Sequence, residues 1–125
     1  MPRIAIVDDS LFLANKIKNY LETQGHEIVG IADDGITGFE LYKTASPDLI
    51  TLDITMPNRD GFECLKDILV FNPDANVIVI SAIDEQAVIV DCINKGAKGF
   101  IEKPLQLKSE VFCQDFNQTV NDALE

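Results

Sequence analysis

Residues 48–53 read DLITLD, a short apolar segment bounded by two aspartates. Its aliphatic and β-branched residues favour an extended chain, and apolar side chains at successive positions indicate a strand buried on both faces. Four more segments have this character, at residues 3–7 (RIAIV), 27–31 (EIVGI), 76–80 (NVIVI) and 99–102 (GFIE). Together with residues 48–52 they predict five strands.

Helical periodicity fills the stretches between these strands. Apolar residues recur there at intervals of three or four, as in Leu11, Ala14, Ile17 and Leu21 and again in Phe62, Leu65, Ile68 and Leu69. Helix and loop boundaries are marked by Gly25, Pro47, Pro73 and Gly96. Five β-α units predict an α/β domain, with a doubly wound parallel sheet covered by helices on both faces.

The composition limits the kinds of partner. The 125 residues include 21 acidic and 10 basic side chains, giving a formal net charge of -11, and 46% of them are apolar. This length and apolar content predict one domain over residues 1–125 and argue against disorder. The acidity argues against nucleic acid or an anionic membrane, because binding to either needs clustered Lys and Arg. A basic partner or a bound cation fits better.

Neither a membrane span nor an export signal is predicted. No apolar run reaches the roughly 18 residues that cross a bilayer, and the opening residues, MPRIAIVDDS, are too acidic for a signal peptide. Cys64, Cys92 and Cys113 are far apart and odd in number, which favours reduced thiols packed as small apolar groups. We therefore expect a cytoplasmic protein.

Polar side chains stand at the carboxyl ends of four predicted strands. Asp8 and Asp9 follow the first, Asp53 ends the third, Ser81 the fourth, and Lys103 follows the fifth. Ligands of doubly wound sheets bind at this edge, where the strand order reverses. We therefore predict a site in which three carboxylates, a hydroxyl group and an ammonium group converge.

Three carboxylates beside one lysine repel one another, so the site needs raised carboxyl pKa values or a hard divalent cation. Mg²⁺ is the natural candidate. A metal ion, a lysine and a hydroxyl group around one carboxylate suit phosphoryl transfer, because that chemistry depends mainly on positioning and charge neutralisation. In this interpretation Asp53 is the nucleophile.

The pattern resembles the receiver domain of response regulators. The matching motifs are Asp8-Asp9, residues 53–57 (DITMP) followed by Asp60-Gly61, Ser81-Ala82 and Lys103-Pro104. Each motif alone is weak, but their order and spacing are specific: 45 residues from Asp8 to Asp53, 28 to Ser81 and 22 to Lys103. The resemblance covers nearly the whole chain and implies a flavodoxin-like (βα)5 fold with strand order 2-1-3-4-5.

The resemblance implies a role for each residue. Asp53 would accept a phosphoryl group from a histidine of a partner kinase. Lys103 and Ser81 would contact that group. Mg²⁺ would be held by Asp8, Asp9, Asp53 and the backbone carbonyl of Thr55. The resemblance also implies a cis peptide bond between Lys103 and Pro104.

A conformational switch is implied as well. In receivers the hydroxyl at Ser81 is coupled to an aromatic ring on the fifth strand, here Phe100, which turns inward when the hydroxyl engages the phosphoryl oxygen. Phosphorylation shifts such a balance only through contacts that differ between the two states, with couplings of about 1–3 kcal/mol. We therefore expect a modest, reversible switch.

The fourth predicted helix is more apolar than one buried face requires. Ile89, Val90, Ile93 and Ala97 form one stripe, and Ala87, Val88 and Cys92 fall outside it. Receivers commonly bind partners through the fourth helix, fifth strand and last helix, so we predict a partner face that includes Val88, Cys92 and Phe100. The same face would serve a weak dimer of an otherwise monomeric chain.

The stripe of the last helix, Phe112, Phe116, Val120 and Leu124, starts later after Pro104 than is usual in receivers. No DNA-binding or catalytic segment is predicted beyond it, so the chain resembles stand-alone regulators, above all the chemotaxis type that acts on the flagellar motor switch. Its partners would be a histidine kinase and a downstream protein, either that switch or a phosphatase. It would be a self-phosphorylating switch rather than an enzyme. A phosphorelay intermediate or phosphate sink has the same sequence features.

Two other classes share part of the pattern. Hydrolases of the haloacid dehalogenase type form an aspartyl phosphate but need Asp-x-Asp after the first strand, whereas Asp8 and Asp9 are adjacent. Flavodoxin-like proteins bind the FMN phosphate where these two aspartates would repel it. Turnover of phosphate esters would support the first class, and a yellow, FMN-containing protein the second.

Two further features are interpreted as structural. Asp33-Asp34-Gly35 is similar to Asp8-Asp9-Ser10 but follows the second strand, at the edge of the sheet, which favours a turn. His26, the single histidine, has no second ligand near it in the sequence, so we expect a structural or exposed side chain.

Overall fold

The computed structural model describes residues 1–54, 56, 60–82 and 86–125. Its strands are β1 (Arg3–Val7), β2 (Glu27–Ala32), β3 (Leu49–Asp53), β4 (Val77–Ala82) and β5 (Gly99–Lys103). Its helices are α1 (Leu11–Thr23), α2 (Gly35–Ala45), α3 (Asp60–Phe71), α4 (Gln86–Lys95) and α5 (Glu110–Leu124). The five predicted strands are confirmed, with ends that differ from the prediction by at most two residues.

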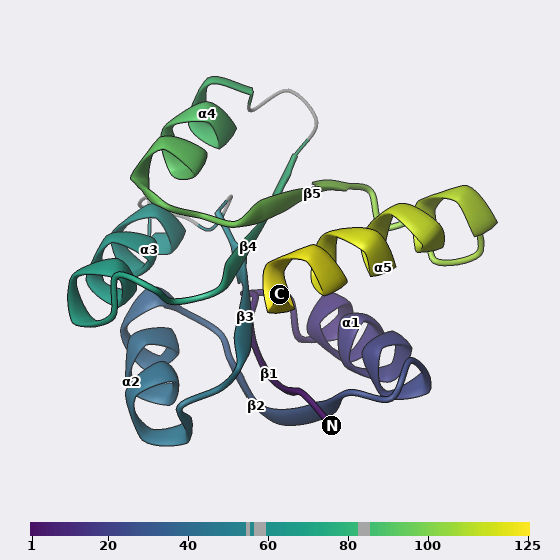
Figure 1. The fold of residues 1–125 in the computed structure, drawn as a ribbon, viewed down its shortest axis with the longest axis horizontal. Coiled ribbons are helices and arrows are strands. Elements are labelled where there is room, and N and C mark those ends of the chain that lie inside the picture. The colour runs from purple at the N-terminus through teal and green to yellow at the C-terminus, as the bar shows by residue number, and fades with distance from the viewer. Residues whose placement is uncertain (55, 57–59, 83–85) are drawn as a thin grey trace.

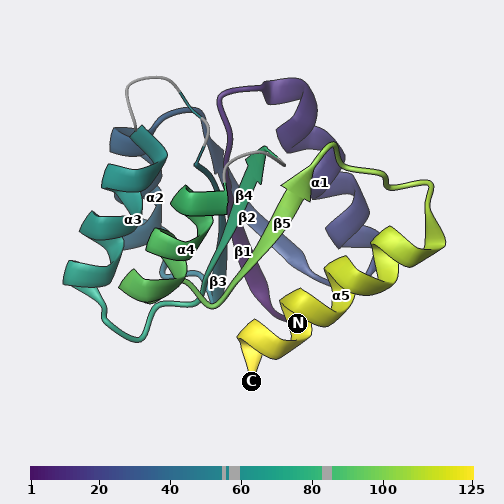
Figure 2. The same ribbon diagram turned by 90° about the horizontal axis from the view of Figure 1, so that it is seen from above.

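The strands form one parallel sheet in the order β2-β1-β3-β4-β5, as the resemblance implied. Helices α2, α3 and α4 cover one face of the sheet and α1 and α5 cover the other (Figure 1). The view from above shows the same two helical layers with the sheet between them (Figure 2). This is the expected doubly wound architecture, with β3 at its centre and the strand order reversing between β1 and β3.

The strands divide their apolar side chains between two cores. In β1, Ala5 and Val7 face the core beneath α2, α3 and α4, whereas Ile4 and Ile6 face the core beneath α1 and α5. These four side chains are at most 1% exposed. Burial on both faces explains why the strand sequences are continuously apolar rather than alternating.

Local signals account for the helix ends. The side chains of Ser10, Asp34 and Ser109 accept hydrogen bonds from the first turns of α1, α2 and α5. Asp33 and Asp34 therefore form a bend after edge strand β2, in agreement with the predicted turn, and Gly35 begins helix α2.

The segment between β5 and α5 contains the cis peptide bond that the resemblance implied. The Lys103–Pro104 bond is cis. The late start of the apolar stripe corresponds to a helix that begins at Glu110, in which Phe116 and Val120 are buried. Tyr20 of α1 donates a hydrogen bond to Oδ1 of Asn117 (2.9 Å), which joins the two helices of this face. Within the described part of the chain, no helix combines the length and apolarity that a bilayer span requires.

Candidate phosphoryl-acceptor site

The carboxyl ends of the central strands bring the predicted acidic residues together. Asp8 directly follows β1, Asp53 is the last residue of β3, and these strands are neighbours. One carboxylate oxygen from each of Asp8, Asp9 and Asp53 can be chosen so that all three lie within 4.8 Å of one another. Asp8 and Asp53 are each only 1% exposed, whereas Asp9 is exposed to solvent. The cluster therefore consists of two buried carboxylates and a third that is exposed to solvent.

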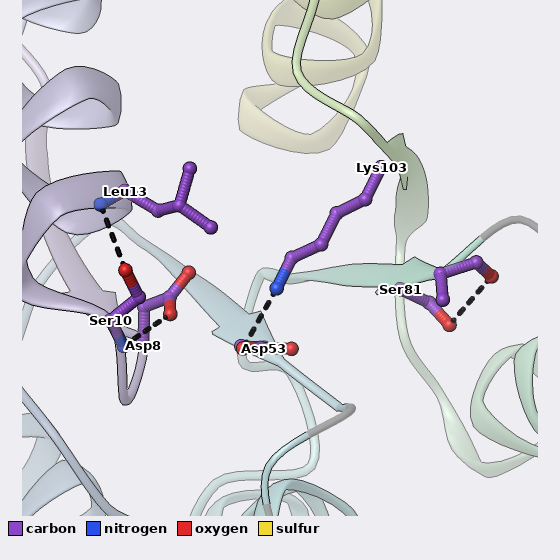
Figure 3. A network of polar contacts seen from close by, with 7 residues as sticks. Asp8, Ser10, Leu13, Asp53, Ser81 and Lys103 are labelled. Atoms are coloured by element: carbon purple, nitrogen blue, oxygen red, sulfur yellow. Dashed lines mark hydrogen bonds and ion pairs between the residues drawn. The ribbon is translucent and has the colours of Figure 1, made fainter.

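Lys103 supplies positive charge to this cluster. Its Nζ atom donates to Oδ2 of Asp53 at 3.0 Å, from the end of β5 (Figure 3). The lysine side chain is 21% exposed and that of Asp53 1% exposed, so the ion pair is largely shielded from water. One ammonium group facing three carboxylates leaves the cluster with an excess of negative charge.

Burial in this cluster disfavours the ionised form of Asp8. Its Oδ1 atom accepts a hydrogen bond from the backbone N–H of Ser10 (2.8 Å), but its buried Oδ2 atom has no hydrogen-bond partner among the described residues. Burial, reinforced by the charge of Asp53, raises the pKa of Asp8 to about 6, although the Ser10 N–H and Lys103 act in the opposite direction. At neutral pH the folded protein therefore holds an ionised, poorly solvated carboxylate here.

The raised pKa predicts an unusual dependence of stability on pH in metal-free buffer. A carboxyl group whose pKa is higher in the folded chain binds more protons there than in the unfolded chain, so it destabilises the fold as pH rises. For Asp8 the free energy of unfolding should fall by about 2–3 kcal/mol between about pH 4 and pH 6 and then level off. Chemical denaturation in EDTA, with Asp8→Asn subtracted as the reference, measures this term. A difference curve that rises or stays flat over that range would contradict it.

The donor set fits a hard divalent cation. The candidate ligands are carboxylate oxygens, which Mg²⁺ prefers, and the unpartnered Oδ2 of Asp8 is a buried acceptor without a donor among the described residues. A cation there would also offset the excess negative charge. Thr55, whose carbonyl was predicted as a further ligand, lies outside the described residues.

Comparison with known proteins identifies the family. Residues 4–111 match the response regulator receiver domain. The chain belongs to this family. It is 43% identical over 119 residues to the chemotaxis protein CheY of Bacillus subtilis, which covers 95% of this chain and 98% of that protein. Identity to CheY of Listeria monocytogenes is 44% over 106 residues, covering 85% of this chain and 89% of the relative.

Solved receiver structures have the same fold. The crystal structure of the CheX-CheY-BeF3-Mg complex from Borrelia burgdorferi has a TM-score of 0.86 and 37% identity, covering 98% of this chain and 89% of that one. The response regulator domain of Thermotoga maritima CheB has a TM-score of 0.85 and 34% identity, covering 99% and 96% of the two chains. The predicted CheY-like fold is thereby confirmed.

Ser81 and Phe100, the two predicted switch residues, lie on the neighbouring strands β4 and β5. Ser81 is fully buried near the end of β4, and its Oγ atom donates to the carbonyl oxygen of Ala82 at 3.3 Å. In Figure 3 this bond lies on the side of Ser81 away from Asp53. Phe100 of β5 is 41% exposed and lines a pocket of about 300 Å³ between α4 and β5. The hydroxyl group thus points away from the acidic cluster while the ring stands outward.

The prediction for the partner face was partly wrong. Cys92 is fully buried and cannot contact a partner, whereas Val88 is partly buried and packs against the core beneath α4. Val90 and Ile93, predicted to share the stripe of Ile89, are instead 56% and 41% exposed. The helix has two apolar arcs, and the arc that contains Ile89 and Cys92 faces the sheet.

The exposed arc of α4, which contains Val90 and Ile93, was not predicted from the sequence. The pocket beside Phe100 is lined by Ile89, Val90, Ile93, Asn94, Phe100 and Glu102. The only signal available in the sequence was the excess of apolar residues on this helix. That excess shows that two apolar faces exist but does not tell which of them is buried.

Among the described residues, the acidic cluster includes none of the cysteines, nor His26 or Asp34. Cys64 and Cys92 are buried thiols, and Cys113 is partly buried. His26 is half-buried at the start of β2, and burial lowers its pKa. Asp34 caps α2 through the backbone N–H of Thr37.

Proposed function

We propose that this receiver is a signalling switch that accepts a phosphoryl group on Asp53 from a phosphohistidine of a kinase. The observation that supports this most directly is the position of Asp53, which is buried in a carboxylate cluster and paired with Lys103 at 3.0 Å. We further propose that residues 1–125 function as one receiver unit in the cytoplasm. The switch uses the phosphoryl group stoichiometrically rather than turning over a substrate.

The chemistry assigned to each side chain follows from its place. A carboxylate oxygen of Asp53 attacks phosphorus, the bond from phosphorus to the donor nitrogen breaks, and that nitrogen leaves with the bonding electrons and takes up a proton. Lys103 orients Asp53 beforehand and offsets negative charge on the transferred oxygens. Asp8, Asp9 and Asp53, together with the carbonyl of Thr55, would hold Mg²⁺, which supplies further positive charge when it is bound.

The response involves Ser81 and Phe100. A phosphoryl group on Asp53 offers an acceptor that draws the Ser81 hydroxyl away from the Ala82 carbonyl, its present partner. Movement of Ser81 toward the site opens space into which Phe100 turns from its outward position. The 300 Å³ pocket between α4 and β5 then changes shape, which alters the surface offered to partners.

The likeness to proteins named CheY supports chemotaxis as the pathway. In this proposal the kinase is a chemotaxis histidine kinase, and the target is the flagellar motor switch or a phosphatase. The exposed Val90, Ile93 and Phe100 form the partner face, which would also serve a weak dimer. A phosphorelay intermediate or phosphate sink would use the same acceptor but would not need this face.

Beryllofluoride, a non-hydrolysable stand-in for the phosphoryl group, tests the switch. With Mg²⁺ it should shift the NMR signals of Ser81, Phe100 and the pocket lining, and it should not do so without Mg²⁺. Ser81→Ala should bind the anion at Asp53 yet leave the Phe100 ring in its outward state. If the wild-type chain binds beryllofluoride while the signals of Phe100 and α4 stay unchanged, the proposed switch is wrong.

A further inference from the structure

Gly61 is buried in the first turn of α3, against the backbone of the acceptor residue. A Cβ atom at this position would overlap the carbonyl oxygen of Asp53 and would lie 2.7 Å from Cα of Ile54 and 3.1 Å from the carbonyl carbon of Asp53. All three contacts are with backbone atoms. No change of rotamer can relieve them, so either α3 or the Asp53–Ile54 peptide must move.

Other close-packed glycines meet softer surroundings. An added Cβ at Gly30 would meet the end of the Leu41 side chain at 2.7 Å, and one at Gly99 would meet Cγ2 of Thr119 at 2.8 Å. Side chains can yield at both places without displacing a strand. Of these three glycines, only Gly61 would displace the backbone of the acceptor residue if it carried a side chain.

The same peptide is fixed on another side by β4. The backbone N–H of Ile54 donates to the carbonyl oxygen of Ile80 at 2.9 Å, and Asp53 is paired with Ile80 in the sheet. Displacement of the peptide by a side chain at Gly61 would strain this hydrogen bond. It would also move the Asp53 carboxylate relative to Lys103, which now lies 3.0 Å away.

We propose that Gly61 is a positioning residue for phosphoryl transfer. By lacking a side chain, it lets α3 seat against the Asp53–Ile54 peptide, which sets the position of the nucleophile relative to Lys103 and the other carboxylates. This inference rests on the proposed function and assigns a role to the Asp60-Gly61 motif. Placement errors of about 1 Å at a reacting group cost roughly 100-fold in rate, so a small backbone displacement is enough to matter.

Gly61→Ala tests the proposal, with Gly99→Ala as the matched control. Gly99 begins β5, at the end of the strand away from Lys103, and its added methyl group is also crowded. Three quantities are measured for both variants: the free energy of unfolding, the rate of labelling by a saturating acyl phosphate in Mg²⁺, and hydrogen exchange of the Ile54 amide. Gly61→Ala should fold, label about 100-fold more slowly and exchange the Ile54 proton faster than its neighbours on β3. Gly99→Ala should match the wild-type chain in rate and in Ile54 exchange.

Three results would overturn the proposal. One is wild-type labelling and Ile54 exchange in Gly61→Ala. Another is loss of rate in both variants in proportion to their loss of stability. The third is failure of Gly61→Ala to fold, which would assign Gly61 to the fold rather than to the site. Absence of labelling in the wild-type chain would refute the proposed function instead, and Ile54 exchange would still decide whether Gly61 positions the peptide.

Discussion

Lys103→Met should slow phosphoryl uptake from an acyl phosphate by about 100-fold or more, because it removes a preorganised cation from the charge that develops on the transferred oxygens. The Lys103 ammonium is 3.0 Å from Asp53 Oδ2, so it also orients the nucleophile. Methionine keeps most of the side-chain length without the charge. The rate is read as phosphorylated fraction against time by intact-protein mass spectrometry at saturating donor and Mg²⁺.

The same substitution should act differently on Mg²⁺ binding and on stability. Mg²⁺ affinity should be kept or raised, since a competing positive charge is gone. Metal-free stability should fall by about 3 kcal/mol, because a buried carboxylate loses its partner. Lys98→Met is the control, since Lys98 is an exposed lysine just before β5, at the end away from the site. Labelling of Lys103→Met at nearly the rate of this control would contradict the role assigned to Lys103.

Asp8→Asn should uncouple the stability of the protein from Mg²⁺. Bound cation stabilises only the folded chain, by about 1.4 kcal/mol at ten times the dissociation constant. Loss of the Asp8 carboxylate, a candidate ligand with an unpartnered Oδ2 atom, should remove most of the rise in melting temperature that millimolar Mg²⁺ gives the wild-type chain. Thermal unfolding with and without Mg²⁺ measures the effect.

In EDTA at pH 7 the same variant should be more stable than the wild-type chain, by about 2 kcal/mol. The amide removes a charge that burial disfavours, and its oxygen can still accept the hydrogen bond from Ser10. Asp74→Asn is the control, because Asp74 is an exposed aspartate just before β4, at the edge of the sheet away from the site. Equal Mg²⁺ stabilisation of Asp8→Asn and the wild-type chain would mean that Asp8 does not hold the cation.

The sequence was sufficient to predict the architecture, because the same physical requirement acts on every strand. A strand covered on both faces needs apolar residues throughout, which is why segments such as DLITLD were recognisable. The site followed from the fold, since parallel strands end at one edge and place Asp8, Asp53 and Lys103 there. Short polar motifs at the strand ends were therefore enough to predict where the acidic cluster and its lysine lie.

Other features depend on packing that periodicity does not encode. Apolar residues occupy two arcs of α4, and only the tertiary structure shows that Cys92 faces the sheet while Val90 and Ile93 face solvent. The direction of the Ser81 hydroxyl depends on rotation about one bond, and the closeness of Gly61 to Asp53 depends on how α3 seats. The lone Oδ2 of Asp8 likewise follows from atomic contacts rather than from residue type.

Intact-protein mass spectrometry after incubation with Mg²⁺ and a small acyl phosphate, on the wild-type chain and on Asp53→Asn, tests the central claim most directly. The wild-type chain should gain one phosphoryl group, the gain should require Mg²⁺, and Asp53→Asn should gain none. Asp48→Asn, at an exposed aspartate just before the other end of β3, should be labelled like the wild-type chain. Unlabelled wild-type protein, or equal labelling of Asp53→Asn, would contradict the assignment of Asp53 as the phosphoryl acceptor.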